Sequence, residues 1–177
     1  MRIISGQLKG RRITPPHNIT ARPTTDFARE GLFNVLNNLL DFETISCLDL
    51  FAGTGAISLE LASRGCPSVV CIEQNDKQLA FIKKAIREFD IKTVFPLKAD
   101  VFKFISATSQ QFDFIFADPP YDLKSLETIP NLIFENRLLK ENGLFVLEHS
   151  RKNDFSNHPQ FSQCRSYGNV QFSFFNS

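Results

Sequence analysis

The sequence lacks the long apolar segments that mark secreted and membrane proteins. Residues 1–10 contain no apolar run of signal-peptide length, and no stretch approaches the ~20 apolar residues that a membrane-spanning helix needs. Repeats, low-complexity segments and an internal linker are also missing. With 177 residues, 42% of them hydrophobic and 22% charged, the chain has the composition of one ordinary globular domain. We therefore expect a single domain over residues 1–177, monomeric and cytoplasmic.

The cysteines form no metal-binding pattern. Cys47, Cys66, Cys71 and Cys164 show no C-x-x-C spacing and have no histidine nearby. Two disulfides are arithmetically possible, but Cys47 and Cys71 lie in apolar, strand-like runs. We expect the cysteines to be reduced, and we expect no metal site.

Positive charge is concentrated near the N-terminus, although the net charge is only +1. Residues 1–29 hold six basic side chains against Asp26 alone, whereas acidic side chains outnumber basic ones in the rest of the chain. We interpret residues 1–25 as a basic hairpin arm, with strands over 2–5 and 11–14, and residues 26–177 as the core. Phosphate binding would require such an arm. A solvated hairpin with incidental charge explains the pattern equally well.

Strands and helices alternate from residue 46 onward. We predict strands over 46–51, 68–73, 93–97, 112–117 and 143–148, and a closing hairpin over 161–165 and 170–175. Helices are predicted over 26–40, 55–64, 75–89 and 101–107, with a further helical stretch to about residue 139, broken near Pro130. This alternation predicts an α/β fold: a doubly wound, mostly parallel, Rossmann-like sheet with helices on both faces.

Three signals fall where the predicted strands end, which is where ligands bind in an open α/β sheet. Gly53 and Gly55 follow the first strand and allow a tight turn close to a ligand. Glu73 ends the second strand, where a carboxylate can accept hydrogen bonds from two ribose hydroxyls. Asp100 follows the third strand and can accept from an adenine amino group. Together they predict an adenosine-type ligand.

Two further residues indicate whether the ligand is a dinucleotide or S-adenosylmethionine. A dinucleotide fingerprint favours glycine or alanine at position 58, where Ser58 stands. The Asp49 carboxylate would suit an α-amino group and would be unhelpful beside a pyrophosphate. We therefore predict S-adenosylmethionine as the cofactor and assign the neighbouring Phe51, Gln74 and Val101 to the same site. A dinucleotide oxidoreductase is the alternative, which a thermal-shift comparison of the two cofactors tests.

A proline-rich turn follows the fourth strand. By default Asp118-Pro119-Pro120-Tyr121 is simply a turn, because proline restricts the preceding residue and has no N–H. In this position, however, the Asp118 carboxylate and the Pro119 carbonyl can accept both hydrogens of an amino group, while Tyr121 stacks on a base. We predict Asp118, Pro119 and Tyr121 as catalytic residues that position an exocyclic amino group for methyl transfer.

These residues carry a family resemblance. Residues 49–55 (DLFAGTG) and 118–121 (DPPY) resemble the amino-methyltransferase pattern. Residues 1–6 (MRIISG), 9–11 (KGR) and 22–26 (RPTTD), with the closing Tyr167-Gly168, resemble the bacterial small-subunit rRNA guanine-N2 methyltransferases, the RsmD family. The similarity spans nearly the whole chain.

The resemblance implies a seven-stranded sheet whose last strand is antiparallel, and a substrate guanine in 16S rRNA of the small ribosomal subunit. It implies cofactor roles for Asp49, Gly53, Gly55, Glu73 and Asp100. It also implies that the basic hairpin faces RNA, so the predicted substrate-binding residues are Lys9, Arg11, Arg12, Arg22, Thr24 and Pro120. Residues 122–142 follow no recognisable pattern, and no substrate contact is assigned to them.

Other functions remain open at this point. The same chemistry could act on adenine N6 in DNA or RNA, or on a protein glutamine amide. DNA enzymes usually carry a target-recognition insertion, for which 177 residues leave no room; a structured RNA supplies recognition by its own shape. A non-catalytic RNA-binding assembly protein is the third possibility. Residues 118–121 argue against it, because a protein that only binds RNA does not need two hydrogen-bond acceptors directed at one amino group.

Overall fold

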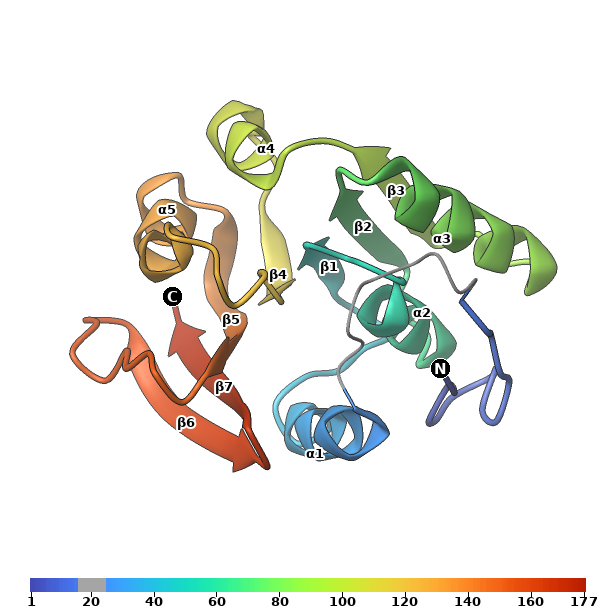
Figure 1. Cartoon of the computed structure of the whole chain (residues 1–177), viewed down its shortest axis with the longest axis horizontal. Coiled ribbons are helices and arrows are strands. Elements are labelled where there is room, and N and C mark those ends of the chain that lie inside the picture. The colour runs from blue at the N-terminus through green and yellow to red at the C-terminus, as the bar shows by residue number, and fades with distance from the viewer. Residues whose placement is uncertain (16–24) are drawn as a thin grey trace.

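The computed structural model describes residues 1–15 and 25–177, which form a seven-stranded sheet in the order β3-β2-β1-β4-β5-β7-β6 (Figure 1). Neighbouring strands from β3 to β5 are parallel, and β7 runs antiparallel to both β5 and β6. The strands are β1 (Ser46–Leu50), β2 (Ser68–Glu73), β3 (Val94–Lys98), β4 (Phe112–Ala117), β5 (Leu139–Ser150), β6 (Phe161–Tyr167) and β7 (Val170–Asn176). The predicted α/β class and the antiparallel last strand are confirmed.

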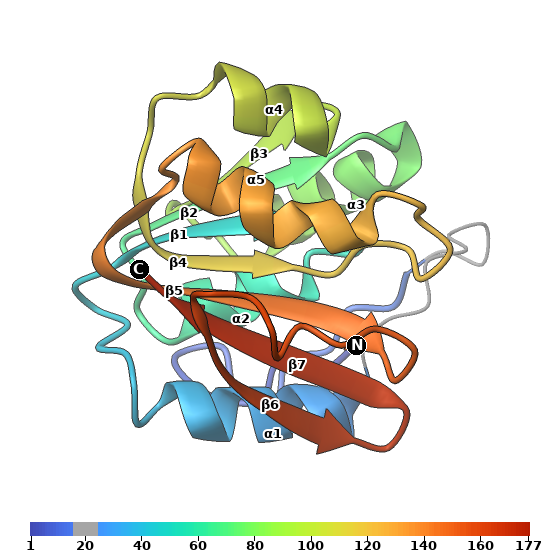
Figure 2. The same cartoon turned by 90° about the vertical axis from the view of Figure 1, so that its left-hand side faces the viewer.

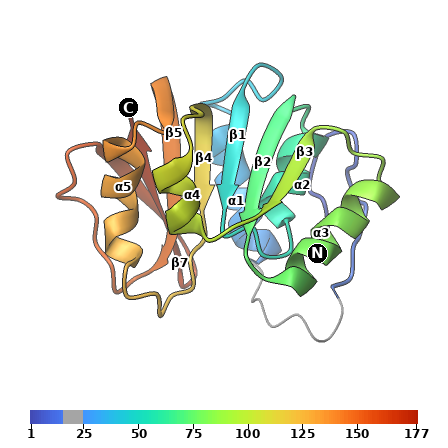
Figure 3. The same ribbon diagram turned by 90° about the horizontal axis from the view of Figure 1, so that it is seen from above.

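Helices cover both faces of the sheet, and each face has its own apolar core (Figure 2). One face carries α1 (Asp26–Leu36), α2 (Ala56–Ser63) and α3 (Asp76–Glu88). The other carries α4 (Val101–Ala107), the short 3-10 helix η1 (Leu126–Thr128) and α5 (Ile129–Glu135). Seen from above, the parallel strands lie side by side between these layers (Figure 3). Because adjacent residues of β1, such as Cys47 and Leu48, are buried in different cores, the parallel strands are apolar on both faces.

Local sequence signals explain where several helices begin. The Thr25 hydroxyl accepts from the Ala28 N–H, and Asn75 accepts from the N–H groups of Lys77 and Gln78, so both act as the predicted N-caps. Pro130 lies in the first turn of α5, where its missing N–H costs no helical hydrogen bond. The helical stretch is interrupted near Pro130, as predicted, since the 3-10 helix η1 ends at Thr128 and α5 begins at Ile129; it ends at Glu135, however, and not near residue 139.

Two other boundaries differ from the prediction. The first helix ends at Leu36 rather than near residue 40, because residues 37–39 form a turn. The strand predicted over 143–148 begins at Leu139, with a register shift against β4 between Phe112 and Phe114. Periodicity could not reveal this extension, because the polar residues 140–142 interrupt the apolar pattern.

In the N-terminal arm, defined here as residues 1–15, the two segments pair antiparallel as predicted: Met1 bonds to Ile13, and Ile3 bonds to Gly10 and Arg11, through backbone hydrogen bonds of 2.9–3.1 Å. Between them Arg2 and Arg12 form an isolated bridge, and two full strands do not form. It is fastened to α2 by the buried Glu60 carboxylate, which accepts from the N–H groups of Ile4 at 2.7 Å and Ser5 at 3.0 Å. Gly6 has a positive φ, and a Cβ there would lie 1.8 Å from the Ser63 carbonyl oxygen. Part of the N-terminal motif therefore has a structural role in docking the arm.

Other features bear on the class of protein. Among the described residues, no helix is long and apolar enough to cross a membrane. The same residues contain no cluster of three or more histidine, cysteine or acidic side chains that could hold a metal ion. All four cysteines are free thiols, three of them buried and Cys164 exposed.

Candidate functional site

Asp49 lies on β1 with only 1% of its surface exposed. Its Oδ2 atom accepts two hydrogen bonds from Ser58 on α2, from the hydroxyl at 2.5 Å and from the backbone N–H at 3.1 Å. Burial raises the pKa of Asp49 to about 7, the nearby Glu73 carboxylate adds to the rise, and the bonds from Ser58 oppose it. Within residues 1–15 and 25–177 no basic side chain pairs with Asp49. A cationic ligand would satisfy this carboxylate.

The turn after β1 requires three residues with positive φ: Phe51, Gly53 and Gly55. Gly55 is the N-cap of α2, and a Cβ there would lie 3.0 Å from a side-chain carbon of Ile82. A Cβ on Gly53 would make only ordinary contacts, at 3.8 Å from Oε1 of Gln78 and from the Phe51 carbonyl oxygen, so its backbone conformation, rather than crowding, favours glycine. Gly53 is half-buried, and its N–H points to the Glu73 carboxylate.

Glu73 ends β2 and lies against this turn. Its carboxylate accepts from the N–H of Gly53 at 2.8 Å and from the N–H of Asn75 at 2.7 Å, one bond to each oxygen. Burial raises the pKa of Glu73, while the backbone N–H groups of Asn75, Gly53 and Gln74 oppose the rise. Because a carboxylate offers about four acceptor positions, each oxygen can still accept one ribose hydroxyl.

The predicted adenine-binding residues lie where α4 begins. Asp100 is the N-cap of this helix, and its Oδ1 atom accepts from the N–H of Lys103 at 3.0 Å. Val101 is buried in the core beneath α4. The Phe51 ring meets the Phe102 ring edge to face, with centroids 6.3 Å apart. Asp100 thus has a structural role as a helix cap, and its second oxygen keeps acceptor capacity for a ligand.

The proline-rich turn lies beside the glycine turn. In the sheet Ala117 pairs with Leu50, and the N–H of Asp118 is 3.4 Å from the Leu50 carbonyl oxygen. Pro119 is buried, whereas Pro120 is exposed. The two predicted sites therefore share one edge of the sheet.

Tyr121 is 47% exposed, and its hydroxyl donates to Oε1 of Glu148 at 3.1 Å. Glu148 lies near the end of β5 and is buried. Sequence reasoning missed Glu148, although an acidic residue directly after the apolar run 144–147 was an available signal. It missed Ser58 in the same way, having read it only as a departure from a dinucleotide fingerprint.

The predicted RNA-binding residues fall into two groups. Lys9, Arg11 and Arg12 are exposed on the N-terminal arm. Arg22 and Thr24 lie outside the described residues. The arm reaches the cofactor turn, since the Thr54 hydroxyl donates to the Met1 sulfur at 3.7 Å. The structure therefore brings the start of the arm next to the glycine turn, whereas Arg11 lies over the Phe89 ring at the far end of α3.

Two arginines counted in the basic N-terminal region have internal partners instead. Arg2 pairs with Glu30 at 2.6 Å on the surface. Arg29 is buried and donates to the Arg2 carbonyl at 2.7 Å and to Asp26 at 2.6 Å. The charge available for RNA is smaller than the sequence count indicates.

Known proteins resemble the chain over most of its length. The profile of the family described as conserved hypothetical protein 95 matches residues 1–176. Several relatives carry the name ribosomal RNA small subunit methyltransferase D, among them the following two. The one from Buchnera aphidicola (subspecies Baizongia pistaciae) is 35% identical over 148 residues, covering 84% of this chain and 75% of the relative. The one from Escherichia coli K12 is 33% identical over 161 residues, covering 86% and 76%.

A solved structure agrees with these sequence matches. A hypothetical protein from Thermus thermophilus superposes with a TM-score of 0.88 at 26% identity, covering 100% of this chain and 99% of that one. The arm, the sheet and the closing hairpin are therefore common to both proteins.

Proposed function

We propose a function from one premise: the chain belongs to the RsmD family, an S-adenosylmethionine-dependent methyltransferase family whose profile it matches over residues 1–176. The proposed reaction transfers a methyl group to the exocyclic N2 of a guanine in 16S rRNA of the small ribosomal subunit. The names of the two relatives support an rRNA substrate. A cytoplasmic, monomeric enzyme remains our expectation.

The residues at the sheet edge fit S-adenosylmethionine. The buried Asp49 would pair with its α-ammonium group, and the Glu73 carboxylate would accept from its ribose hydroxyls. Asp100, Val101 and Phe51 would surround its adenine, with Phe102 as an additional apolar contact. Bound there, the cofactor supplies a sulfonium methyl group with a good leaving group. The chain's own contribution to catalysis is then mainly positioning.

One observation carries the assignment of amino-group chemistry: the Asp118-Pro119-Pro120-Tyr121 turn is held beside the cofactor turn. The Asp118 N–H bonds to β1, and the Tyr121 hydroxyl bonds to Glu148 on β5, so both ends of the turn are fixed. We assign the Asp118 carboxylate and the Pro119 carbonyl as acceptors for the two amino hydrogens. Accepting both localises the nitrogen lone pair toward the methyl group.

Tyr121 would stack on the target base, which offsets part of the cost of extruding that base. Its hydrogen bond to Glu148 fixes the hydroxyl end of the ring, so less side-chain freedom is lost on binding. The exposed Lys9, Arg11 and Arg12 would contact RNA that extends from this edge along α2, since Leu8 bonds to Ser63 at the end of α2 and Arg11 lies over Phe89 at the end of α3. Pro120, exposed beside Tyr121, would contact the substrate there.

The direct test is methyl transfer to small ribosomal subunits from a strain that lacks the enzyme, with tritiated S-adenosylmethionine and nucleoside mapping. Label in N2-methylguanosine supports the proposal. Label in N6-methyladenosine, or in protein, would assign the same chemistry to another substrate. Binding of the subunits without transfer would favour a non-catalytic assembly protein.

A further inference from the structure

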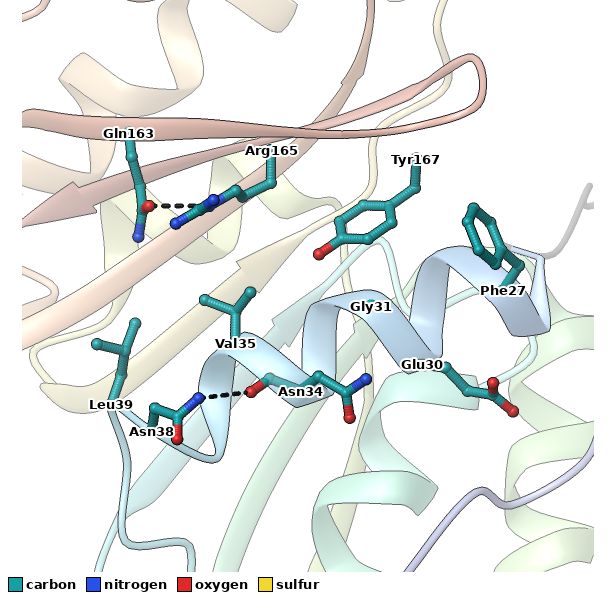
Figure 4. A pocket seen from close by; sticks show the side chains of 10 residues that line it. All are labelled: Phe27, Glu30, Gly31, Asn34, Val35, Asn38, Leu39, Gln163, Arg165 and Tyr167. Atoms are coloured by element: carbon teal, nitrogen blue, oxygen red, sulfur yellow. Dashed lines mark hydrogen bonds between the residues drawn. The ribbon is translucent and has the colours of Figure 1, made fainter.

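A groove of about 510 Å³ lies between α1 and β6, outside the site described above (Figure 4). We propose that this α1–β6 groove binds an unpaired nucleotide of the substrate RNA, adjacent to the target guanine. The inference rests on the proposed function, because it names a second contact made by the same RNA. The groove would give a function to residues 163–167, which have no role in the proposed methyl transfer.

The aromatic end of the groove is built around a glycine. Gly31 lies in the middle of α1, where glycine costs about 1 kcal/mol relative to alanine. A Cβ on Gly31 would lie 2.0 Å from a ring carbon of Tyr167, so the absence of a side chain lets this ring lie directly on the helix. Phe27 meets the Tyr167 ring edge to face at 5.9 Å and is itself 67% exposed. An exposed ring held by a second ring is a stacking platform for a base.

The rest of the groove is lined by groups that recognise base edges. Asn34 projects from α1 and Asn38 from the turn that follows it, while Gln163 and Arg165 face them from β6 (Figure 4). Amide side chains both donate and accept, which matches the mixed donors and acceptors of a base edge. The Arg165 guanidinium donates to Gln163 at 2.9 Å, and this bond holds it over the groove with further N–H groups available.

The charge of the groove suits a polyanion. Glu30 is its acidic lining residue, and the Arg2 guanidinium pairs with it at 2.6 Å. Arg165 is exposed. The positive charge of Arg165 is thus left to attract a phosphate.

Strand register connects the groove to the catalytic turn. Glu148, which holds Tyr121, pairs with Phe172 on β7, and Phe172 pairs with Arg165 on β6. Directly paired residues point to the same face of a sheet, so Glu148 and Arg165 lie on one face, two strand spacings or roughly 10 Å apart. A single RNA strand with its target base at Tyr121 can therefore place a neighbouring nucleotide in the groove.

RNA fits this groove better than a protein does. A protein partner favours an apolar centre from which charged residues are depleted. Here Val35 is the apolar residue at the centre, with amides and the Arg165 guanidinium around it, and the exposed apolar residues Phe27 and Leu39 stand at the two ends. The groove also opens beside a site that would already hold RNA.

Photocrosslinking identifies the occupant. The full-length protein with Phe27 replaced by p-benzoylphenylalanine is irradiated on small ribosomal subunits that lack the modification. The crosslink should fall on 16S rRNA, within a few nucleotides of the methylated guanine. A crosslink to a ribosomal protein or to a second copy of the chain, or no crosslink at all, would overturn the inference.

Kinetics test the energetic contribution of the groove. The double variant Phe27→Ala with Arg165→Gln should raise KM for the subunits roughly tenfold or more, because one stacking contact alone is worth that much. Its kcat and its Kd for S-adenosylmethionine should not change. The matched control is Phe95→Ala with Arg87→Gln, which removes another exposed phenylalanine and an arginine away from the groove, on β3 and α3.

The two proposals fail in different ways. If the unmodified protein methylates RNA while the double variant keeps its KM, the groove inference is wrong and the proposed function stands. If the unmodified protein transfers no methyl group to RNA, the proposed function fails and the groove inference fails with it.

Discussion

Asp49 is a carboxylate whose negative charge is costly in its surroundings. Burial raises its pKa to about 7, so near neutral pH the protein without ligand holds a mixture of the acid and the carboxylate. Only the carboxylate pairs well with an α-ammonium group. The affinity for S-adenosylmethionine should therefore rise as the pH increases through about 7 and level off above about pH 8. Calorimetric titration at several pH values measures this, and an affinity that is independent of pH would contradict the pairing.

The same shift predicts how stability responds to pH. The folded-state pKa of Asp49 lies above the unfolded value of about 3.9, so the folded protein binds the proton more tightly than the unfolded chain does. The contribution of this group to stability is present below about pH 4 and is lost as the pH rises toward 7. Asp49→Asn should therefore unfold at a higher temperature than the unmodified protein at pH 8, yet bind the cofactor more weakly. Thermal unfolding with and without the cofactor checks both effects.

Glu73 connects the glycine turn to the expected ribose site. Glu73→Ala should weaken S-adenosylmethionine binding by about 1.5–3 kcal/mol, the usual range for hydrogen bonds to a charged group. Glu73→Gln is the matched control: it keeps an acceptor for one backbone N–H and should lose less affinity. If both variants bind as tightly as the unmodified protein, Glu73 does not contact the cofactor.

Asp118 should matter for transfer rather than for cofactor binding. Asp118→Ala removes one of the two proposed acceptors and should lower kcat by about 10²-fold or more. Its Kd for the cofactor should stay nearly unchanged, because the Asp118 contact to β1 is made by its backbone. Loss of cofactor binding together with activity would count against the assigned role.

At the scale of elements, the strands β2 and β4 and the helix α4 match the predicted ranges. These segments combine apolar runs with clear start and stop residues, so the local sequence determines their boundaries. Tertiary contacts determine the boundaries of the elements that were predicted less well. The extension of β5 back to Leu139 depends on pairing with β4, and the arm depends on Glu60 of α2.

The candidate site could be predicted in part for the same reason. Asp49, Gly53, Gly55 and Glu73 lie beside or at strand ends, so the fold class alone places them together. Ser58 and Glu148 contribute through contacts with residues 9 and 27 positions away, Asp49 and Tyr121 respectively, which no single-sequence pattern encodes.

Some residues of the N-terminal arm dock it on the core, and others carry the positive charge proposed to contact RNA. Deleting it would remove the core residues Ile3 and Ile13, so charge removal is the cleaner test of RNA contact. The triple variant Lys9→Gln, Arg11→Gln, Arg12→Gln should keep its unfolding temperature. It should bind small ribosomal subunits more weakly and with a shallower dependence on salt, because fewer counterions are released. An unchanged salt slope would exclude the arm from the RNA interface.

By contrast, Glu60→Ala should weaken the docking of the arm. Glu60 is fully buried, accepts from two arm N–H groups and pairs with Arg64 at 2.8 Å, so its loss leaves donors and a charge without a partner. Destabilisation of roughly 3 kcal/mol is expected in urea unfolding. Faster proteolysis within residues 1–15 should accompany it, and an arm as resistant as before would show that other contacts hold it.

At the scale of the whole molecule, one edge of the sheet collects the cofactor turn and the proline-rich turn, which the parallel order β2-β1-β4 brings together. The arm reaches this edge through Met1 and runs along α2 away from it, to Ser63. The α1–β6 groove is connected to the same edge through β7. One continuous surface can therefore hold a methyl donor, a target base and flanking RNA.

The central claim is that the Asp118-Pro119-Pro120-Tyr121 turn presents acceptors to an amino group of an RNA base. Tritiated methyl transfer to small ribosomal subunits that lack the modification, with mapping of the labelled nucleoside, tests it most directly. We expect label in N2-methylguanosine of 16S rRNA, and its loss with Asp118→Ala. Label on a ring nitrogen, on a ribose or on carbon would contradict the claim, because those acceptors have no NH2 group for the turn to hold.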